Sequence, residues 1–495
     1  MELLYAQADA RPEATAVVYK DERISFAELV ERIERLASGL AAQGIGAGDS
    51  VGIVLRDDPW FVASFHAIAA LGARIVPANP AFKQAELDHW FRSTGCRAVI
   101  SDERTAGVVG RIVAGFDPPA FVIGSGEGHG QTLTLAGLAE SGSAERLAPR
   151  SPEEPLVCQF SSGSTGLPKR LNRTHGQCVA EAESYGALGL GPEDRIFAAV
   201  PLFHTWGMGA CLFGAAVSGA TLVILDDPHP FLLRRHHALE LLEREGVTFF
   251  PGVPFNYRLL AEAPGDADLS KLRLCWSAGM ALPRETFEAF GERFGVLVRQ
   301  LYGSTETGMI AANLSDDPVA SFESVGTAVE GVEIGIVDDD GEPLPVGEIG
   351  EVTVAGPAVT EGYIDLDELN AVAFQGGRYF TGDLGRLDDD GALTIVGRKK
   401  LLIETGGYKV DPIEVEQVLD SHPAVAESIV VGVDTKAVGE QQLKAVVVRS
   451  GDCEERELIA HCREQLANFK VPQSVEFRDE IPKSPLGKVL RKYLV

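Results

Sequence analysis

An alternation of apolar strand-like runs with amphipathic helical runs is the feature that most constrains the fold of this chain. Ser25-Phe26-Ala27-Glu28 is a capping box, and the apolar residues after it recur at helical spacing as far as Leu40. Further on, the sequence predicts strands at 51–55, 74–77 and 98–100, with helices at 60–71 and 85–93. Repeated strand–helix–strand units pair their strands in parallel through right-handed crossovers. We therefore expect an α/β fold with a large N-terminal domain of parallel sheets.

The same pattern returns later in the chain, and there each predicted strand ends in a polar or glycine-rich motif. The strands are expected at 247–250, 272–276 and 296–301. The motifs that follow them are Pro251-Gly252-Val253-Pro254, Ser277-Ala278-Gly279 and Tyr302-Gly303-Ser304-Thr305-Glu306-Thr307. In open α/β sheets the ligand crevice lies beyond the carboxyl ends of the strands. The sequence therefore predicts that these motifs converge on one active site.

A stretch rich in hydroxyl residues and glycine, from Phe160 to Arg170, is suited to binding phosphate. Glycines let successive backbone N–H groups converge, the hydroxyls add donors, and Lys169 adds a positive charge. The Walker A spacing is not met, because Leu167 and Pro168 separate Gly166 from the lysine. We therefore expect a polyphosphate site different from that of an ordinary P-loop NTPase. The alternative is a Ser/Gly-rich surface turn.

Composition excludes several classes of partner. The chain has 495 residues with 45% hydrophobic content, enough for about three domain-sized units. Its formal net charge of −28 argues against nucleic acid or an anionic membrane as a partner. The number of cysteines, seven, is odd, and no two of them form a C-x-x-C motif. Residues 1–14 lack the apolar core of a signal peptide. We therefore expect reduced, buried thiols and a cytoplasmic protein.

One long segment without charged residues resembles a membrane span by length alone. Residues 196–225 contain no Asp, Glu, Lys or Arg. Pro201, His204 and several glycines interrupt the segment, and it ends in a run of β-forming residues. We interpret it as strand, loop, buried helix and strand, so no stable membrane insertion is expected.

From about residue 331 the sequence changes to short β-runs with tight turns. Asp-Gly turns at 338–341 and 388–391 predict hairpins and a small β-subdomain at about 331–397. Beyond Gly397-Arg398-Lys399-Lys400, we expect two helices and three strands, which indicates a separate α+β domain. The predicted helices lie at 412–419 and 454–466, and the strands at 428–433, 443–448 and 474–477. The expected domains are thus 1–398 and 399–495.

Taken in order, the motifs resemble those of the ANL superfamily of adenylate-forming enzymes, which includes acyl- and aryl-CoA synthetases, adenylation domains and luciferases. The resemblance covers nearly the whole chain. It rests on residues 161–169, Pro201-Leu202-Phe203-His204, residues 302–306, Tyr379-Phe380-Thr381-Gly382-Asp383, residues 397–400 and Pro482-Lys483-Ser484-Pro485-Leu486-Gly487-Lys488.

The resemblance implies a reaction in two steps. A carboxylic acid attacks the α-phosphate of ATP, which releases pyrophosphate and gives an acyl-adenylate. A thiol, here coenzyme A, then displaces AMP. Mg²⁺ is implied as a cofactor, with Glu306 as its ligand. The implied catalytic residues are Lys488, His204, Thr165 and Glu306.

The implied nucleotide site draws on every motif. Tyr302 resembles the residue that stacks on adenine, Asp383 the ribose-binding carboxylate, and Lys488 the lysine that bridges α-phosphate and carboxylate. The alternatives are a core aromatic for Tyr302, a hairpin-turn aspartate for Asp383 and a solvated tail lysine for Lys488. The implied nucleotide-binding residues are Ser161, Ser162, Gly163, Ser164, Thr165, Gly166, Lys169, Ser277, Ala278, Gly279, Tyr302, Gly303, Ser304, Thr305, Asp383, Arg398 and Lys488.

The acyl pocket is implied beside the same motifs. Three methionines adjoin them, and Met280 stands where relatives tend to keep Ala or Gly. A long side chain there predicts a small or medium acid, either aromatic or short-chain aliphatic; ordinary core packing of the methionines is the alternative. Residues 205–208 contain no aspartate for an α-ammonium, so an α-amino acid is not expected. The implied pocket residues are His204, Trp206, Met208, Val253, Met280, Met309 and Ile310.

The C-terminal domain is implied to move between the two steps. Lys400 occupies the position of the family hinge, and Gly406, Gly407 and Tyr408 would lie along the pantetheine arm, although a plain turn is the alternative. At two positions this chain departs from the residue that is usual in the family. Arg170 replaces the usual glycine, which predicts a stiffer loop exit or an added anion contact, and Glu404 replaces a common lysine, which leaves the coenzyme A contacts open.

The sequence thus predicts an acid–thiol ligase that uses a small-molecule carboxylic acid, ATP and coenzyme A. Two other functions remain open. One is a stand-alone adenylation enzyme that loads a phosphopantetheinylated carrier protein. The other is a non-catalytic protein that binds a nucleotide or an acyl-adenylate.

Overall fold

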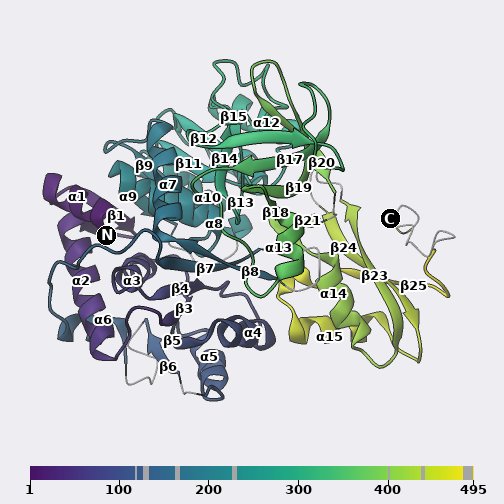
Figure 1. The fold of residues 1–495 in the computed structure, drawn as a ribbon, viewed down its shortest axis with the longest axis horizontal. Helices are drawn as coiled ribbons and strands as arrows, with labels where there is room; N and C mark the ends of the chain where they lie inside the picture. Colours follow the sequence, from purple (N-terminus) through teal and green to yellow (C-terminus); the bar gives the residue numbers. More distant parts are fainter. Residues whose placement is uncertain are drawn as a thin grey trace. The chain divides into compact units, whose positions relative to one another are not determined.

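The chain forms two compact units, each built around its own sheets. The computed structural model describes residues 1–117, 120–125, 133–161, 168–225, 231–399, 402–435, 441–482 and 494 (Figure 1). Unit 1 comprises Met1–Pro80, Trp90–Gln159 and Arg170–Gly397, and unit 2 comprises Ala81–His89, Phe160–Lys169 and Arg398–Val495.

The first sheet of unit 1 has six strands and follows the predicted strand–helix pattern. Its strand order is β6 (Phe121–Gly124), β5 (Cys96–Ser101), β3 (Ser50–Val54), β4 (Arg74–Pro77), β7 (Pro155–Ser161) and β8 (Lys169–Thr174). The pairs from β6 through β7 are parallel, as predicted. The accompanying helices are α2 (Phe26–Ala42), α3 (Pro59–Ala70), α4 (Gln84–Thr94), α5 (Ala106–Val113) and α6 (Leu135–Ser141).

The capping box at the start of α2 is present as expected. The Ser25 side chain accepts a hydrogen bond from the Glu28 N–H, and the Glu28 carboxylate accepts one from the Ser25 N–H. These bonds satisfy backbone donors that have no partner inside the helix. One face of α2 is then buried, so the predicted periodicity places this helix against the core.

The second sheet has nine strands and carries most of the predicted site. Its order is β15 (Thr327–Ala328), β14 (Gly308–Ala312), β13 (Val298–Ser304), β12 (Leu274–Ser277), β11 (Phe249–Gly252), β9 (Arg195–Ala198), β10 (Thr221–Ile224), β1 (Thr15–Tyr19) and β2 (Glu22–Ser25). The strands from β13 to β1 are parallel. Both ends of the sheet are antiparallel, which the strand–helix pattern did not predict, because β2 and β14 follow their partners through short connections.

The two faces of this sheet belong to different cores. Phe249 and Phe250 are neighbours in β11, yet each is fully buried in a separate cluster, because successive strand side chains point to opposite faces. The first cluster joins the two sheets with helices such as α2, α3 and α7 (His175–Ala187). The second lies under α10 (Phe231–Arg244), α11 (Pro254–Ala261) and α12 (Arg284–Phe294). The remaining N-terminal helix is α1 (Glu2–Ala10).

The segment 196–225 has the predicted order of strand, loop, buried helix and strand. Between β9 and β10 the chain forms α8 (Thr205–Gly207), a π-helix η2 (Met208–Phe213) and α9 (Gly214–Ser218). Across the part of the chain that the structure describes, no helix has both the length and the apolar character to cross a membrane. All seven cysteines are free and buried, as predicted.

The predicted β-subdomain is a five-stranded sheet. Its path runs β16 (Glu333–Val337), β17 (Gly350–Ala355), β19 (Arg378–Leu387) and β18 (Phe374–Gln375), with β20 (Leu393–Arg398) paired to β19. A short helix, α13 (Asp367–Ala373), precedes β18. The core of this sheet contains Val352, Val354 and Leu393, and Ile310 of β14 packs into it.

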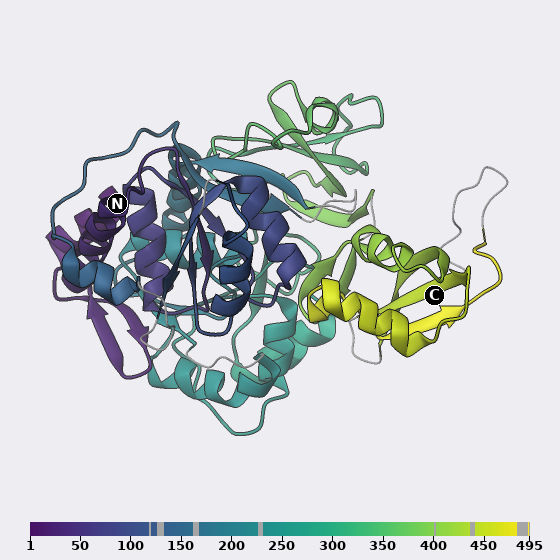
Figure 2. The same ribbon diagram turned by 90° about the horizontal axis from the view of Figure 1, so that it is seen from below.

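Unit 2 contains the predicted α+β arrangement. A hairpin of β21 (Ile403–Thr405) and β22 (Tyr408–Val410) precedes a sheet ordered β23 (Val425–Asp434), β24 (Gln441–Arg449) and β25 (Ser474–Phe477). The helices α14 (Pro412–Asp420) and α15 (Glu455–Gln465) pack against each other and against this sheet, and η3 (Asn468–Lys470) follows them (Figure 2). The hydrophobic core of unit 2 includes Val415, Leu443 and Leu458, all fully buried.

Candidate active site

Three neighbouring strands bring the predicted motifs to one edge of the nine-stranded sheet. In the register of β11, β12 and β13, Gly252 lies beside Ser277 and Ser277 beside Gln300. The motifs therefore leave adjacent parallel strands at the same end, as the sequence predicted. Gly279 has a φ of +86°, a conformation that a residue with a side chain rarely adopts, so glycine suits this turn.

Tyr302 and Asp383, both predicted to bind the nucleotide, are in direct contact. The Tyr302 hydroxyl donates a hydrogen bond of 2.6 Å to Asp383 Oδ2, across 81 residues of sequence. Asp383 lies inside β19 and not in a hairpin turn, and its N–H donates to the Thr381 hydroxyl at 3.0 Å. Thr381 in turn donates to the Val352 carbonyl at 2.9 Å. The carboxylate is therefore fixed beside the ring of Tyr302.

Glu306 is buried and is oriented by a tyrosine that the sequence did not indicate for this role. It is 5% exposed, and its Oε1 accepts a hydrogen bond of 2.8 Å from the Tyr363 hydroxyl. The hydroxyls of Tyr363 and Tyr379 lie 3.3 Å apart. Burial, followed by the nearby Glu306 carboxylate, raises the pKa of Tyr379 well above its usual value. Tyr379 therefore keeps its proton at physiological pH and lies in this group as a neutral hydroxyl.

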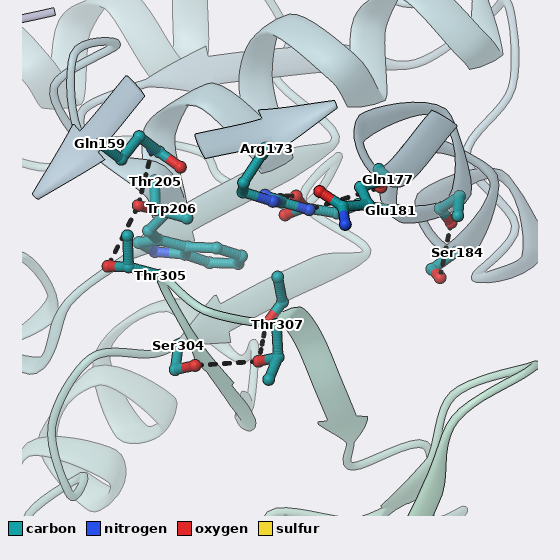
Figure 3. Close-up of polar contacts among 12 residues, drawn as sticks. Gln159, Arg173, Gln177, Glu181, Ser184, Thr205, Trp206, Ser304, Thr305 and Thr307 are labelled. Carbon is teal, nitrogen blue, oxygen red and sulfur yellow. Dashed lines mark hydrogen bonds and ion pairs between the residues drawn. The ribbon is translucent and has the colours of Figure 1, made fainter. Parts of the chain in front are cut away.

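A chain of side chains connects Gln159 of β7 with the Tyr302 motif. Gln159, just before the loop, donates from Nε2 to the Thr205 hydroxyl at 2.9 Å (Figure 3). The Thr205 hydroxyl donates to the Thr305 hydroxyl at 3.4 Å. Neither Gln159 nor Thr205 was identified from sequence as a site residue, although each adjoins a motif that was.

Two buried hydroxyls at the predicted site have no hydrogen-bond partner among the described residues. They are the Oγ atoms of Ser161 and Ser277, whose residues are 8% and 1% exposed. Buried polar atoms are almost always paired in native proteins. Unpaired hydroxyls at the ends of strands that carry predicted nucleotide-binding motifs are consistent with partners supplied by a ligand.

In the loop after β9, His204 is exposed to solvent whereas Trp206 is buried. His204 is exposed, and its Nδ1 accepts a hydrogen bond of 3.2 Å from the Trp206 N–H. The Trp206 indole is 7% exposed and donates to the Gly252 carbonyl at 3.1 Å. This bond connects the histidine loop with the end of β11.

The predicted acyl-pocket residues divide into two groups. Met208 and Met309 are buried in the same cluster as Trp206, whereas Val253 and Met280 are partly exposed. Ile310, one residue after Met309, faces the opposite side of β14 and packs into the core of the β-subdomain. The structure therefore separates Ile310 from the cluster that contains the methionines.

Several predicted residues lie outside the described part of the chain. They are the loop residues Ser162, Gly163, Ser164, Thr165 and Gly166, the proposed hinge Lys400, and Lys488.

In unit 2, Gly406 and Gly407 form the turn between β21 and β22. Their φ angles are +55° and +84°, so this turn requires glycine at both positions. Tyr408 stacks on Phe469 with ring centroids 4.0 Å apart. Arg398 is exposed at the end of β20.

Both departures from the family pattern are explained by contacts with the protein itself. Arg170 forms an ion pair with Asp365, and its carbonyl accepts a hydrogen bond of 2.7 Å from the Ile364 N–H. The exit of the predicted phosphate loop is thereby attached to the segment around residue 365. Glu404 lies opposite Lys409 in the β21–β22 hairpin, and burial raises the pKa of its carboxyl.

Comparison with known proteins identifies the family along the whole chain. The family model for AMP-binding enzymes matches residues 4–364, and the model for the AMP-binding enzyme C-terminal domain matches residues 414–488. A feruloyl-CoA synthase from an Amycolatopsis species is 32% identical over 493 residues, covering 98% of this chain and 96% of that enzyme. A 2-succinylbenzoate–CoA ligase from Geobacillus kaustophilus is 33% identical over 497 residues, covering 99% of this chain and 96% of that ligase.

Solved structures agree with these sequence relatives. The o-succinylbenzoate CoA synthetase from Bacillus subtilis, bound with its product analogue, matches with a TM-score of 0.88 and 29% identity, covering 99% of this chain and 98% of that one. The amide bond synthetase McbA from Marinactinospora thermotolerans matches with a TM-score of 0.89 and 28% identity over the same shares. This chain therefore belongs to the AMP-binding enzymes of the ANL superfamily of adenylate-forming enzymes.

Proposed function

We propose that this chain is an AMP-forming carboxylate–CoA ligase, that is, an acyl-CoA synthetase. It activates a carboxylic acid with ATP and transfers the acyl group to coenzyme A. The observation that carries the proposal is the hydrogen bond between Tyr302 and Asp383, two residues from motifs that are both predicted to bind the nucleotide. The named activities of the relatives, most of them CoA ligases, support the same reaction.

In the first step, the acid and the nucleotide must be held in line. The Asp383 carboxylate can accept hydrogen bonds from both ribose hydroxyls, and the ring of Tyr302 offers a face for adenine. A carboxylate oxygen of the acid then bonds to the α-phosphorus while the bond from that phosphorus to the bridging oxygen breaks, and pyrophosphate leaves. In our proposal Lys169 and Lys488 neutralise the phosphate charge that limits this attack, and the Thr165 hydroxyl donates a hydrogen bond to a phosphate oxygen.

Mg²⁺ is proposed to bind at Glu306. Among the described residues there is no group of three or more His, Cys, Asp and Glu side chains able to hold a metal ion. A single buried carboxylate is nevertheless a suitable ligand, because Mg²⁺ commonly binds one or two carboxylates together with phosphate oxygens and water. The bound ion would neutralise phosphate charge, and the Tyr363 hydrogen bond would keep the carboxylate in position.

In the second step, a thiol replaces AMP on the acyl carbon. We propose that Lys400 is the hinge between an N-terminal domain over 1–398 and a C-terminal domain over 399–495. The Gly406–Gly407 turn has no β-carbons and would allow the pantetheine arm to approach the backbone beside Tyr408. Coenzyme A is the proposed acceptor, and a phosphopantetheinylated carrier protein is the alternative.

The acid is proposed to be aromatic or of short to medium chain length. The relatives named above act on ferulate and 2-succinylbenzoate, both of which carry an aromatic ring. A panel of aryl, short-chain and long-chain acids, scored by pyrophosphate release, tests the class of acid. The same reactions with coenzyme A or with a phosphopantetheinylated carrier protein then identify the acceptor. If no acid in the panel releases pyrophosphate, a non-catalytic binding protein becomes the better interpretation.

Asp383→Ala is expected to weaken ATP binding much more than acid binding. A hydrogen bond to a charged group contributes about 1.5–3 kcal/mol, so the KM for ATP should rise by roughly tenfold to a hundredfold. The KM for the acid should stay within about twofold. Tyr302→Phe is the matched control, because it removes the hydroxyl that contacts Asp383 but keeps the ring. A larger change in the KM for the acid would remove Asp383 from the nucleotide site.

Met280→Ala is expected to shift the preference toward longer acids. Met280 is partly exposed in the turn after β12, whereas Met208 and Met309 are buried in the core. Shortening this side chain should therefore lengthen the pocket with little loss of packing. Each added methylene contributes at most about 0.8 kcal/mol, or roughly fourfold in kcat/KM. The measurement is the chain-length profile of pyrophosphate release, and an unchanged profile in a folded variant would contradict the assignment.

A further inference from the structure

A fully buried ion pair lies beside the predicted acyl pocket and takes no part in the chemistry described above. Arg173 of β8 and Glu181 of α7 have side chains that are 0% and 2% exposed. The guanidinium Nη1 donates to Glu181 Oε2 (Figure 3). Although burial alone would lower the pKa of Arg173, the Glu181 carboxylate raises it above its usual value, so the arginine stays charged.

Two glycines make room for the Glu181 carboxylate. A β-carbon on Gly308 would lie 2.7 Å from Glu181 Cδ, and one on Gly209 would lie 2.3 Å from Glu181 Oε1. Gly209 follows Met208 in η2, and Gly308 precedes Met309 in β14. The carboxylate therefore reaches the backbone of both elements that carry the buried methionines of the predicted pocket.

The ion pair is only partly satisfied by the protein. Arg173 Nε is buried and has no hydrogen-bond partner among the described residues. The hydrogen bond from Arg173 Nη1 goes to Glu181 Oε2, so it does not occupy Oε1. A Gly209 β-carbon would also lie 2.8 Å from the Tyr185 hydroxyl, so this hydroxyl and Oε1 approach the same point of the backbone.

Such a pair contributes little to stability by itself. The cost of removing two charges from water commonly equals or exceeds their attraction, and apolar side chains of similar volume are often as stable or more so. An incompletely paired buried group therefore calls for another explanation. Here the Glu181 carboxylate, whose Oε1 does not take the bond from Arg173, lies between two elements of the predicted acyl pocket.

We propose that the Arg173–Glu181 pair forms the polar end of the acyl pocket and selects an acid with a hydroxyl group remote from its carboxylate. Glu181 Oε1 would accept the hydrogen bond from that hydroxyl. Arg173 already neutralises Glu181, so a neutral donor fits this end better than an ammonium group. The proposal rests on the proposed acid activation and narrows its substrate class to hydroxylated acids.

The test compares matched acids that differ only by the hydroxyl. The pairs are 4-hydroxycinnamate with cinnamate and 4-hydroxybenzoate with benzoate, together with the 3-hydroxy isomers. Their kcat/KM values are measured by pyrophosphate release. We expect the wild-type enzyme to prefer at least one hydroxylated acid over its partner by about tenfold or more, because a site that hydrogen-bonds a substrate hydroxyl discriminates against the analogue that lacks it.

The double variant Arg173→Met/Glu181→Leu removes both charges while keeping similar volume. We expect it to fold, to retain activity on the unhydroxylated acids within about threefold, and to lose the preference to within about twofold. Glu181→Gln is the second variant. It keeps the shape of the side chain and should lower the preference several-fold even if the double variant does not fold. Ser184→Ala on the same helix is the control, since its hydroxyl donates within the helix, to the Ala180 carbonyl.

The outcomes separate this inference from the proposed function. A wild-type enzyme that activates acids without a hydroxyl preference, or folded variants that keep the wild-type preference, would overturn the inference and leave the ligase assignment intact. The absence of pyrophosphate release with every acid would instead overturn both.

Discussion

Lys488→Ala is expected to slow acid-dependent ATP–pyrophosphate exchange by about a hundredfold or more. That is the usual loss when one group that stabilises developing charge in a transition state is removed. Lys488 ends the Pro482-Lys483-Ser484-Pro485-Leu486-Gly487-Lys488 motif, at the last residue matched by the C-terminal family model. Its ammonium is proposed to neutralise the α-phosphate and to hold the attacking carboxylate.

The second half-reaction provides the internal comparison for this variant. Thioester formation from supplied acyl-adenylate should stay close to the wild-type rate, because the phosphorus chemistry has already taken place. Lys483→Ala is a matched control that removes a lysine from the same motif and should affect neither step strongly. If Lys488→Ala slows both half-reactions equally, the lysine is structural or is shared by the two steps.

The sequence predicted the fold well where the information is local. The Ser25–Glu28 capping box, the helical spacing of α2 and the strand-ending motifs after β11 and β12 depend on residues only a few positions apart. Such patterns follow from the periods of helices and strands. The antiparallel pairing of β13 with β14 was missed, because the Tyr302 motif was interpreted as following the strand although β13 continues through Ser304.

Contacts between residues far apart in the sequence were the part of the site that was hardest to predict. Glu306 and Tyr363 are 57 residues apart, and no spacing or period connects them. Tyr302 and Asp383 were named together only through the resemblance of their motifs to a family. Ile310 was grouped with Met309 because both follow Glu306, whereas the alternation of side chains along β14 places it in another core.

The buried pair Arg173–Glu181 shows a further limit of sequence reasoning. Eight residues separate the two side chains, and a strand end followed by a helix start lies between them. Neither the helical nor the strand period relates such positions. Only the structure shows that α7 brings Glu181 back to Arg173 and against the glycines of two other elements.

Glu306→Gln is expected to reduce pyrophosphate release by about a hundredfold or more at a fixed Mg²⁺ concentration. Glutamine keeps the size of the side chain and a carbonyl oxygen for the Tyr363 hydroxyl, but it removes the negative charge that Mg²⁺ requires. Raising the Mg²⁺ concentration should restore part of the activity, because weaker binding is then compensated by mass action. The measurement is the rate of pyrophosphate release as a function of Mg²⁺ concentration at saturating ATP and acid.

Tyr363→Phe separates the charge of Glu306 from its orientation. This variant keeps the carboxylate and removes the 2.8 Å hydrogen bond that fixes Oε1. The rate of pyrophosphate release should therefore fall only about tenfold, which corresponds to a loss of about 1.4 kcal/mol. The Mg²⁺ concentration that the enzyme requires should shift only slightly. If Glu306→Gln and Tyr363→Phe give equal losses and the same Mg²⁺ dependence as the wild type, Glu306 acts through the hydrogen-bonded tyrosines, and the metal ligand must be sought elsewhere.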